Sequence, residues 1–414
     1  MITGNGLRGI MCRRDKLTLA ALCAGHFVND SYSSIIYPLL PLIKIKLGLT
    51  AAQVFWLAPL YAISSSLMQP VYGFISDRYF RRFFAVCGPI ITGIFVSMIG
   101  LAPSYGILIV LLVAGGIGIG SFHPQAAAMA AVASGERRRV GMAMFSALGT
   151  LGFAIGPLVI TRVVSAYGME HSYYIVGAGV LMSAVLYRVC PPLPAHSSTV
   201  PGVEKTKWQL LAALRTAWKP LTLLYLITVI RSGLQMTTNN YLPFMLEDRG
   251  YALTDTGNVM TVFLLLGGIG GLAGGFTAER FSGRAVTLYS GLLAGPLMIG
   301  AFATTGPLSI VCLGLGGFML LATLPVIVAM AQELVPGQTS TVSALMMGAA
   351  WGVGALAPQA LSNFVPAFGF RNVLIVASAV TMVTAVLAYF LPREEPRHRT
   401  VIESDLATVT AVGD

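Results

Sequence analysis

Long apolar stretches with few charged residues dominate the chain, and short polar segments separate them. A bilayer's hydrocarbon layer of roughly 30 Å takes about 20 helical residues to cross. By this measure the pattern predicts twelve membrane-spanning helices. They are expected near residues 17–40, 52–74, 83–102, 105–131, 140–164, 171–189, 220–245, 255–278, 285–304, 306–333, 338–364 and 370–391.

The composition supports a membrane protein, because 56% of the 414 residues are hydrophobic and only 10% are charged. A water-soluble core of this size does not require so much apolar surface. An outer-membrane barrel would instead show segments of about ten residues that alternate between apolar and polar positions. These runs do not alternate, so we expect an all-α integral membrane protein. The first span follows a basic segment but lacks a small-residue cleavage site, and we expect it to be retained.

The positions of the basic residues predict the orientation. Placing both termini on one side of the membrane puts 20 of the 26 Lys and Arg residues on that side. The positive-inside rule therefore predicts cytoplasmic termini. The formal net charge of +10 indicates contact with anionic lipid headgroups and gives no reason to expect a nucleic-acid partner.

The longest polar stretch between spans divides the twelve predicted helices into six and six. It predicts a cytoplasmic linker that ends in an interfacial amphipathic segment. The expected organisation is an N-terminal six-helix bundle (1–190), the linker (191–219), a C-terminal six-helix bundle (220–392) and a cytoplasmic tail (393–414).

Residues recur between the two halves at an offset of 201 or 202 positions, which indicates an internal duplication. Examples are Pro41 with Pro243, Gly48 with Gly250, Pro124 with Pro325, and Gly168 with Gly369. The match is sharpest after the second and eighth spans, where Gly73, Asp77, Arg78 and Arg82 correspond to Gly275, Glu279, Arg280 and Arg284.

This duplicated loop resembles the signature of the major facilitator superfamily, although Phe80 stands where that signature has Gly. The resemblance implies two pseudo-symmetric six-helix bundles that rock around a central cavity, with substrate bound near the middle of the bilayer. It also implies that the eight loop residues control the conformational change at the cytoplasmic face. A charged loop that only anchors the topology is the alternative.

Four ionisable residues lie deep within predicted spans: His26, Asp30, His123 and Arg231. A charge at such depth costs about 2.5 to 3.5 kcal/mol on insertion scales, so it usually faces a cavity or a partner. His26 and Asp30 are four residues apart and share one helix face. We expect Asp30, His26 and His123 to be the candidates for proton coupling, because access to water and substrate can switch their protonation. The alternative is that they only hydrogen-bond neighbouring helices.

Arg231 lies midway along the seventh span, and the repeat places it opposite Asn29, beside the equivalent of Asp30. Because Arg stays charged, we expect it to be neutralised by Asp30 or by an anionic substrate; the alternative is a permanent structural salt bridge. The predicted substrate-binding residues are Arg231, Tyr37, Gln235, Asn239 and Gln125.

In the fifth span Gly152, Gly156 and Pro157 resemble the core of the superfamily's antiporter motif, without its closing glycines. We assign these three residues to the conformational change as well. The fourth span lacks the Arg of many drug antiporters, which favours His123 as a proton carrier. The segments 26–30 and 122–125 resemble the fosmidomycin-resistance branch, which implies a proton-linked exporter in the bacterial inner membrane.

The predicted function is a proton-coupled antiporter that exports a small polar or anionic compound or drug by alternating access. An importer of an organic anion, with Arg231 as its clamp, is the rival within transport, and a membrane receptor is the rival outside it. No enzyme activity, cofactor or metal is expected, since five scattered cysteines form no ligand set. The expected partners are the small-molecule substrate, protons and membrane lipids, and the chain is expected to be a monomer.

Overall fold

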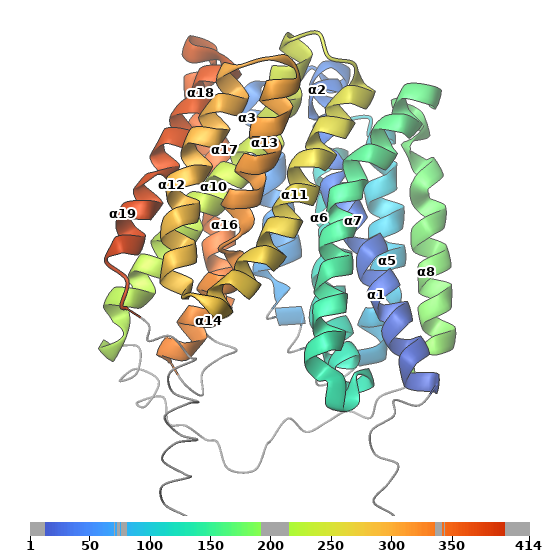
Figure 1. The fold of residues 1–414 in the computed structure, drawn as a ribbon. Coiled ribbons are helices and arrows are strands. Elements are labelled where there is room, and N and C mark those ends of the chain that lie inside the picture. Colours follow the sequence, from blue (N-terminus) through green and yellow to red (C-terminus); the bar gives the residue numbers. More distant parts are fainter. Residues whose placement is uncertain are drawn as a thin grey trace, which may run out of the picture. The chain divides into compact units, whose positions relative to one another are not determined.

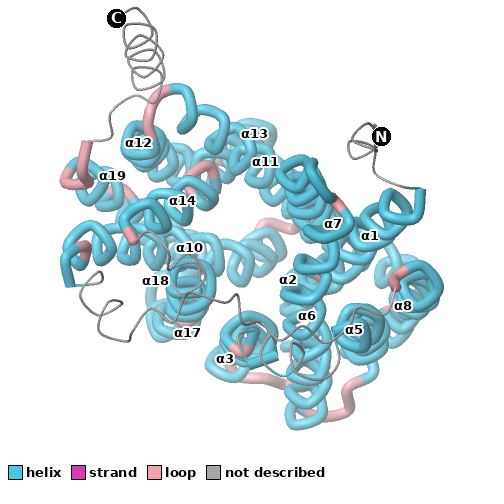
Figure 2. Tube along the Cα trace, turned by 90° about the horizontal axis from the view of Figure 1, so that it is seen from below, coloured by secondary structure: helices cyan, strands magenta, loops and turns pink. Residues whose placement is uncertain are grey.

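The computed structural model describes residues 13–69, 71–72, 75, 81–191, 215–335, 342 and 344–393. Within these ranges the chain forms helices joined by short loops and contains no strand (Figure 2). Gly73, Asp77, Arg78 and most of the predicted linker and tail lie outside the described residues.

The first half begins with helices α1 (Arg13–Ser34), α2 (Ile36–Leu47) and α3 (Ala51–Ala62), followed by the π-helix η1 (Ile63–Leu67). It continues with α5 (Arg81–Ser97), η2 (Met98–Leu101), α6 (Tyr105–Ala133), η3 (Gly135–Arg137), α7 (Arg138–Tyr167), η4 (Met169–Ile175) and α8 (Val176–Val189).

The second half begins with α10 (Trp218–Asp248), α11 (Leu253–Arg280), α12 (Gly283–Ala303), α13 (Gly306–Leu321) and α14 (Leu324–Leu334). It continues with η5 (Ala344–Ala349), α16 (Ala350–Gly354), α17 (Ala357–Leu361), η6 (Ser362–Phe364), α18 (Val365–Thr381) and α19 (Val383–Tyr389).

Eight described helices are long and apolar enough to cross a membrane. Helices α2 and α3 have only 12 residues each, and α1 and α10 carry the polar side chains of the candidate sites, so these four are not among the eight. The long span Leu345–Tyr389 covers two of the predicted crossings. The all-helical membrane fold is therefore confirmed, whereas the count of twelve spans stays a prediction.

The contacts between residues divide the chain into two compact units. The first unit consists of Met1–Val203, Asn239–Leu265 and Pro358–Pro366, and the second consists of Glu204–Thr238, Leu266–Ala357 and Ala367–Asp414. The first unit thus includes the end of α10 and the start of α11. There the Tyr241 ring lies 4.6 Å from the Phe55 ring, and its hydroxyl donates to the carbonyl of Pro358.

Small residues bring the helices of the first unit together. Helices α1 and α7 run side by side (Figure 1). Gly152 faces the backbone of Phe27, and Gly156 faces that of Ser31, so closely that a Cβ at either glycine would overlap main-chain atoms. Close backbone approach at small residues is how membrane helices pack in the absence of a hydrophobic driving force.

In the second unit, glycines likewise allow close backbone contact between α11 and the end of α13. A Cβ at Gly270 or Gly274 would overlap the backbone of Phe318 or Ala322. The glycine-rich run of α11 is therefore a packing surface, as its position inside an apolar helix predicts.

The offset of the sequence repeat reappears in backbone conformation and in contacts. Gly168 and Gly369 both have positive φ, at 91° and 72°, a conformation that favours glycine. Arg82 donates to the carbonyl of Tyr187 in α8, and Arg284 donates to that of Tyr389 in α19. Each guanidinium also lies over the ring of its tyrosine. In each half, the arginine thus links the third predicted span of that half to its sixth.

Candidate functional site

Three ionisable side chains from two helices meet in the first unit. His26 and Asp30 lie on α1, one turn apart, and His123 comes from α6. The Asp30 carboxylate lies between the rings, with Oδ2 3.1 Å from His26 Nε2 and Oδ1 2.9 Å from His123 Nε2. The exposed fractions of the three side chains are 10% for His26, 16% for Asp30 and 23% for His123. The structure thus brings together the three residues that the sequence analysis selected as proton carriers.

Backbone carbonyls fix the orientation of both imidazoles. His26 Nδ1 donates to the carbonyl of Phe145 over 2.8 Å, and His123 Nδ1 donates to that of Ile119 over 2.7 Å. A carbonyl oxygen can only accept, so Nδ1 must carry the hydrogen in each ring. The other ring nitrogen of each histidine, Nε2, faces the Asp30 carboxylate.

Helix α7 supplies two contributors that the sequence analysis missed. The Phe145 ring stacks on the His26 ring with a centroid distance of 4.1 Å. Gly149, one turn further along α7, leaves the space that the His26 ring fills, because a Cβ there would overlap the imidazole. No periodicity marks either residue, and only the contact between α1 and α7 reveals them.

Further polar groups surround the cluster. The buried hydroxyl of Tyr61 in α3 interacts electrostatically with Asp30. Asn29, on the other side of α1, accepts a hydrogen bond of 3.0 Å from Thr92 Oγ1. The ligand atoms of the three ionisable side chains lie within 4.8 Å of one another, which is also close enough for one metal ion to bridge them.

Arg231 in α10 is buried and donates to backbone carbonyls at the end of α13. Its Nε lies 3.0 Å and its Nη2 2.7 Å from the Leu320 carbonyl, and Nη2 also donates to Met319. Among the described residues Arg231 forms no ion pair, and its Nη1 has no hydrogen-bond partner. Arg231 lies in the second compact unit and Asp30 in the first, so neutralisation of Arg231 by Asp30 or by an anionic substrate stays a prediction. Carbonyls at a helix C-terminus carry partial negative charge, which explains how this cation tolerates burial.

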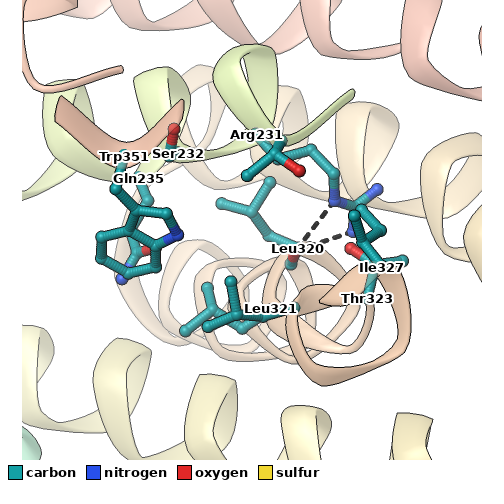
Figure 3. Close-up of a pocket in the computed structure, with 10 residues that line it drawn as sticks. Arg231, Ser232, Gln235, Leu320, Leu321, Thr323, Ile327 and Trp351 are labelled. Carbon is teal, nitrogen blue, oxygen red and sulfur yellow. Dashed lines mark hydrogen bonds between the residues drawn. The ribbon is translucent and has the colours of Figure 1, made fainter. Parts of the chain in front are cut away.

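A small pocket lies beside Arg231 in the second unit (Figure 3). Gln235, Ser232 and Thr228 from α10 line it, together with Thr323 and Trp351. Figure 3 shows the Trp351 ring and the Arg231 guanidinium at opposite ends of this pocket. Arg231 and Gln235, two of the predicted substrate-binding residues, thus share one surface.

The other three predicted substrate-binding residues lie in the first unit. Tyr37 is buried in α2, with its ring 6.5 Å from that of Phe153. Gln125 and Asn239 are also buried, and neither Gln125 Oε1 nor either amide atom of Asn239 has a hydrogen-bond partner in the described part of the chain. The five residues are thus divided between the two units, and a substrate site that they share stays a prediction.

The described residues assigned to the conformational change are distributed along four helices, α5, α7, α11 and α12. Pro157 lies within α7, after the two tightly packed glycines. Gly275, Glu279 and Arg280 form the last turns of α11, where a Cβ at Gly275 would meet open space. Of the duplicated loop residues that are described, only Arg82 and Arg284 make the helix-to-helix hydrogen bond reported above.

Comparison with known proteins identifies the family. The family model described as Major Facilitator Superfamily matches residues 22–252 and again 224–412. The chain is 29% identical to the MFS-type transporter YfnC of Bacillus subtilis and 27% identical to the fosmidomycin resistance protein of Escherichia coli, over 92% of this chain and 93% of each relative. A solved bacterial homologue of the lysosomal transporter Spinster, 19% identical, covers 91% of this chain and 95% of its own with a TM-score of 0.74. The chain therefore belongs to the Major Facilitator Superfamily and is a multi-pass membrane transporter rather than an enzyme.

Proposed function

We propose that this protein is a proton-driven antiporter that exports a small polar or anionic compound. The observation that carries the proposal is the His26–Asp30–His123 cluster. A buried carboxylate between two imidazoles offers groups that can take up and release protons, and such groups inside a membrane span mark proton relays in pumps and transporters. The fosmidomycin resistance protein among the relatives favours export.

The packing around the cluster suggests how protonation could drive a conformational change. Helix α1 carries two members of the cluster, and its backbone is held against Gly152 and Gly156 of α7. Helix α7 also supplies the carbonyl that orients His26. A change of charge at the cluster therefore acts on a packed helix pair, and rigid groups of this kind rock as units in alternating access.

Arg231 supports an anionic substrate. Among the described residues, backbone carbonyls alone offset its charge, and its Nη1 has no hydrogen-bond partner. A guanidinium suits the paired oxygens of a carboxylate or phosphonate. We assign substrate binding to Arg231 and Gln235 in the second unit and to Tyr37, Gln125 and Asn239 in the first. Rocking of the two bundles would bring these groups to the substrate in turn.

The same arginine supports the rival function, a proton-linked importer of an organic anion. The two readings differ in the direction of the coupled proton, because an antiporter moves substrate against the proton flow and an importer moves it with the flow. A membrane receptor, the third reading, would show no flux.

Location and orientation complete the proposal. The bacterial relatives favour the inner membrane, and the excess of Lys and Arg in alternate loops favours cytoplasmic termini. We further propose that the protein acts as a monomer, that anionic lipids contact its basic loops, and that the loops around Asp77 and Glu279 control the cytoplasmic face.

Flux in proteoliposomes tests the proposed function. The protein is reconstituted, and uptake of radiolabelled fosmidomycin and of a panel of small organic anions is measured with the lumen acidic, with the lumen alkaline and with no gradient. An antiporter concentrates substrate only when the lumen is acidic, and an ionophore that removes the gradient abolishes the effect. Concentration only with an alkaline lumen would establish the importer instead.

A further inference from the structure

We propose that the His26–Asp30–His123 cluster carries two protons in each transport cycle, one on each imidazole. This inference rests on the proton-coupled transport proposed above and adds the number of protons and their positions. It follows from which nitrogen of each ring holds a hydrogen in the observed geometry.

Both imidazoles have already committed one nitrogen to a backbone carbonyl. The Nδ1 atoms donate to Phe145 and to Ile119, at 2.8 Å and 2.7 Å. A neutral imidazole has a single N–H. A neutral His26 or His123 would therefore turn a bare Nε2 lone pair toward Asp30.

An unprotonated Nε2 would repel the carboxylate oxygen that faces it, because both atoms are hydrogen-bond acceptors. The distances between these atoms are 3.1 Å for His26 and 2.9 Å for His123. A hydrogen between them converts each contact into an attractive, charge-assisted one. The geometry thus calls for two bridging hydrogens, one in each gap. With both present the charges are +2 on the imidazoles and −1 on the carboxylate, and the cluster is cationic. Loss of one proton makes it neutral, and loss of the second makes it anionic.

In the described part of the chain, the groups that face the cluster from the neighbouring helices carry no formal charge. Helix α3 presents the Tyr61 hydroxyl, α7 presents the ring and carbonyl of Phe145, and α6 presents the Ile119 carbonyl. In the described ranges, the ion pairs of Asp30 are those with the two histidines. Because one carboxylate serves both rings, a movement that withdraws Asp30 opens both gaps together and favours release of both protons.

The coupling ratio is measured in proteoliposomes with the membrane voltage held at zero. Fosmidomycin is the probe, and the substrate gradient that exactly stops net flux is determined for an imposed pH difference of about one unit. Two-proton exchange balances a substrate gradient of about a hundredfold, and one-proton exchange balances about tenfold. We expect a hundredfold for the wild type and tenfold for His26→Gln and for His123→Gln. His171→Gln, a histidine outside the cluster, is the matched control and should keep the wild-type value.

A wild-type ratio of tenfold would overturn this inference while leaving proton coupling intact, whereas a pH gradient without effect would remove the proposed function itself. Nitrogen-15 NMR of histidine-labelled protein gives a second test that needs no substrate. At neutral pH we expect the signals that disappear in His26→Gln and in His123→Gln to be those of doubly protonated rings. A neutral ring with an unprotonated Nε2 at either position would contradict the two-proton cluster.

Discussion

Gly149 of α7 lies against the imidazole of His26 in α1, with no room for a side chain between them. The same helix holds the ring through the hydrogen bond from His26 Nδ1 to the carbonyl of Phe145, one turn before Gly149. A residue without a side chain thus determines where the His26 ring can lie.

Gly149→Ala should displace His26 from Asp30 and impair concentrative transport. Overpacking of this kind typically costs about 1 to 3 kcal/mol, so we expect a moderate fall in thermal stability and a larger fall in gradient-driven uptake. The measurement compares uptake at equal amounts of reconstituted protein. Gly177→Ala in α8 is the control, because a Cβ there meets nothing within 4 Å. Equal uptake by the two variants would show that Gly149 has no role at the cluster.

Arg231→Ala should weaken binding of anionic compounds and leave neutral ones unaffected. Loss of a hydrogen bond to a charged group costs about 1.5 to 3 kcal/mol, or about ten- to a hundredfold in affinity. Competition binding to purified protein gives the two affinities. Arg371→Ala is the matched control, since Arg371 also donates to carbonyls at a helix end, those of Phe302 and Ala303. A loss of stability without discrimination between anions and neutral compounds would reduce Arg231 to a cap on α13.

Arg284→Gln and Arg82→Gln should destabilise the protein by similar amounts, because each removes the same contact with the last span of its half. One hydrogen bond of this kind contributes about 0.5 to 1.5 kcal/mol. Thermal unfolding in one detergent provides the comparison, with Arg280→Gln as a control that removes only a contact with Phe281. Unequal effects would show that the two arginines are not equivalent.

The orientation can be checked by labelling. On a background without native cysteines, Ser198→Cys should react with an impermeant maleimide only after the cells are opened. Ser104→Cys, in the exposed turn before α6, should react in intact cells. The reverse pattern would place the termini outside.

Much of the fold could be predicted because membrane-spanning helices consist of continuous runs of apolar residues. The runs at 105–131 and 255–278 became Tyr105–Ala133 and Leu253–Arg280. The breaks were not predictable in the same way. The turn at Ile35 between α1 and α2 and the π-helix Ile63–Leu67 lie inside the predicted spans 17–40 and 52–74, whose sequence would also suit a straight helix.

The site was predictable only where chemistry is local. The four-residue spacing of His26 and Asp30 placed them on one face, and the cost of burying a charge singled out His123. The partners of Arg231 could not be predicted, because they are the backbone carbonyls of Met319 and Leu320. Every residue has a backbone carbonyl, so the sequence does not single these two out. Within its own unit Asp30 pairs with the two histidines, and its pairing with Arg231 of the other unit stays a prediction.

If protonation of the His26–Asp30–His123 cluster drives transport, Asp30→Asn should uncouple transport from the proton gradient. The amide keeps the volume of the side chain but lacks the negative charge that holds the protons on the two imidazoles. In proteoliposomes the variant should still exchange labelled for unlabelled fosmidomycin across the membrane, because exchange requires no net proton movement. It should fail to concentrate fosmidomycin when the lumen is acidic, whereas the wild type succeeds. Concentration by Asp30→Asn at the wild-type level under the same pH difference would contradict the account.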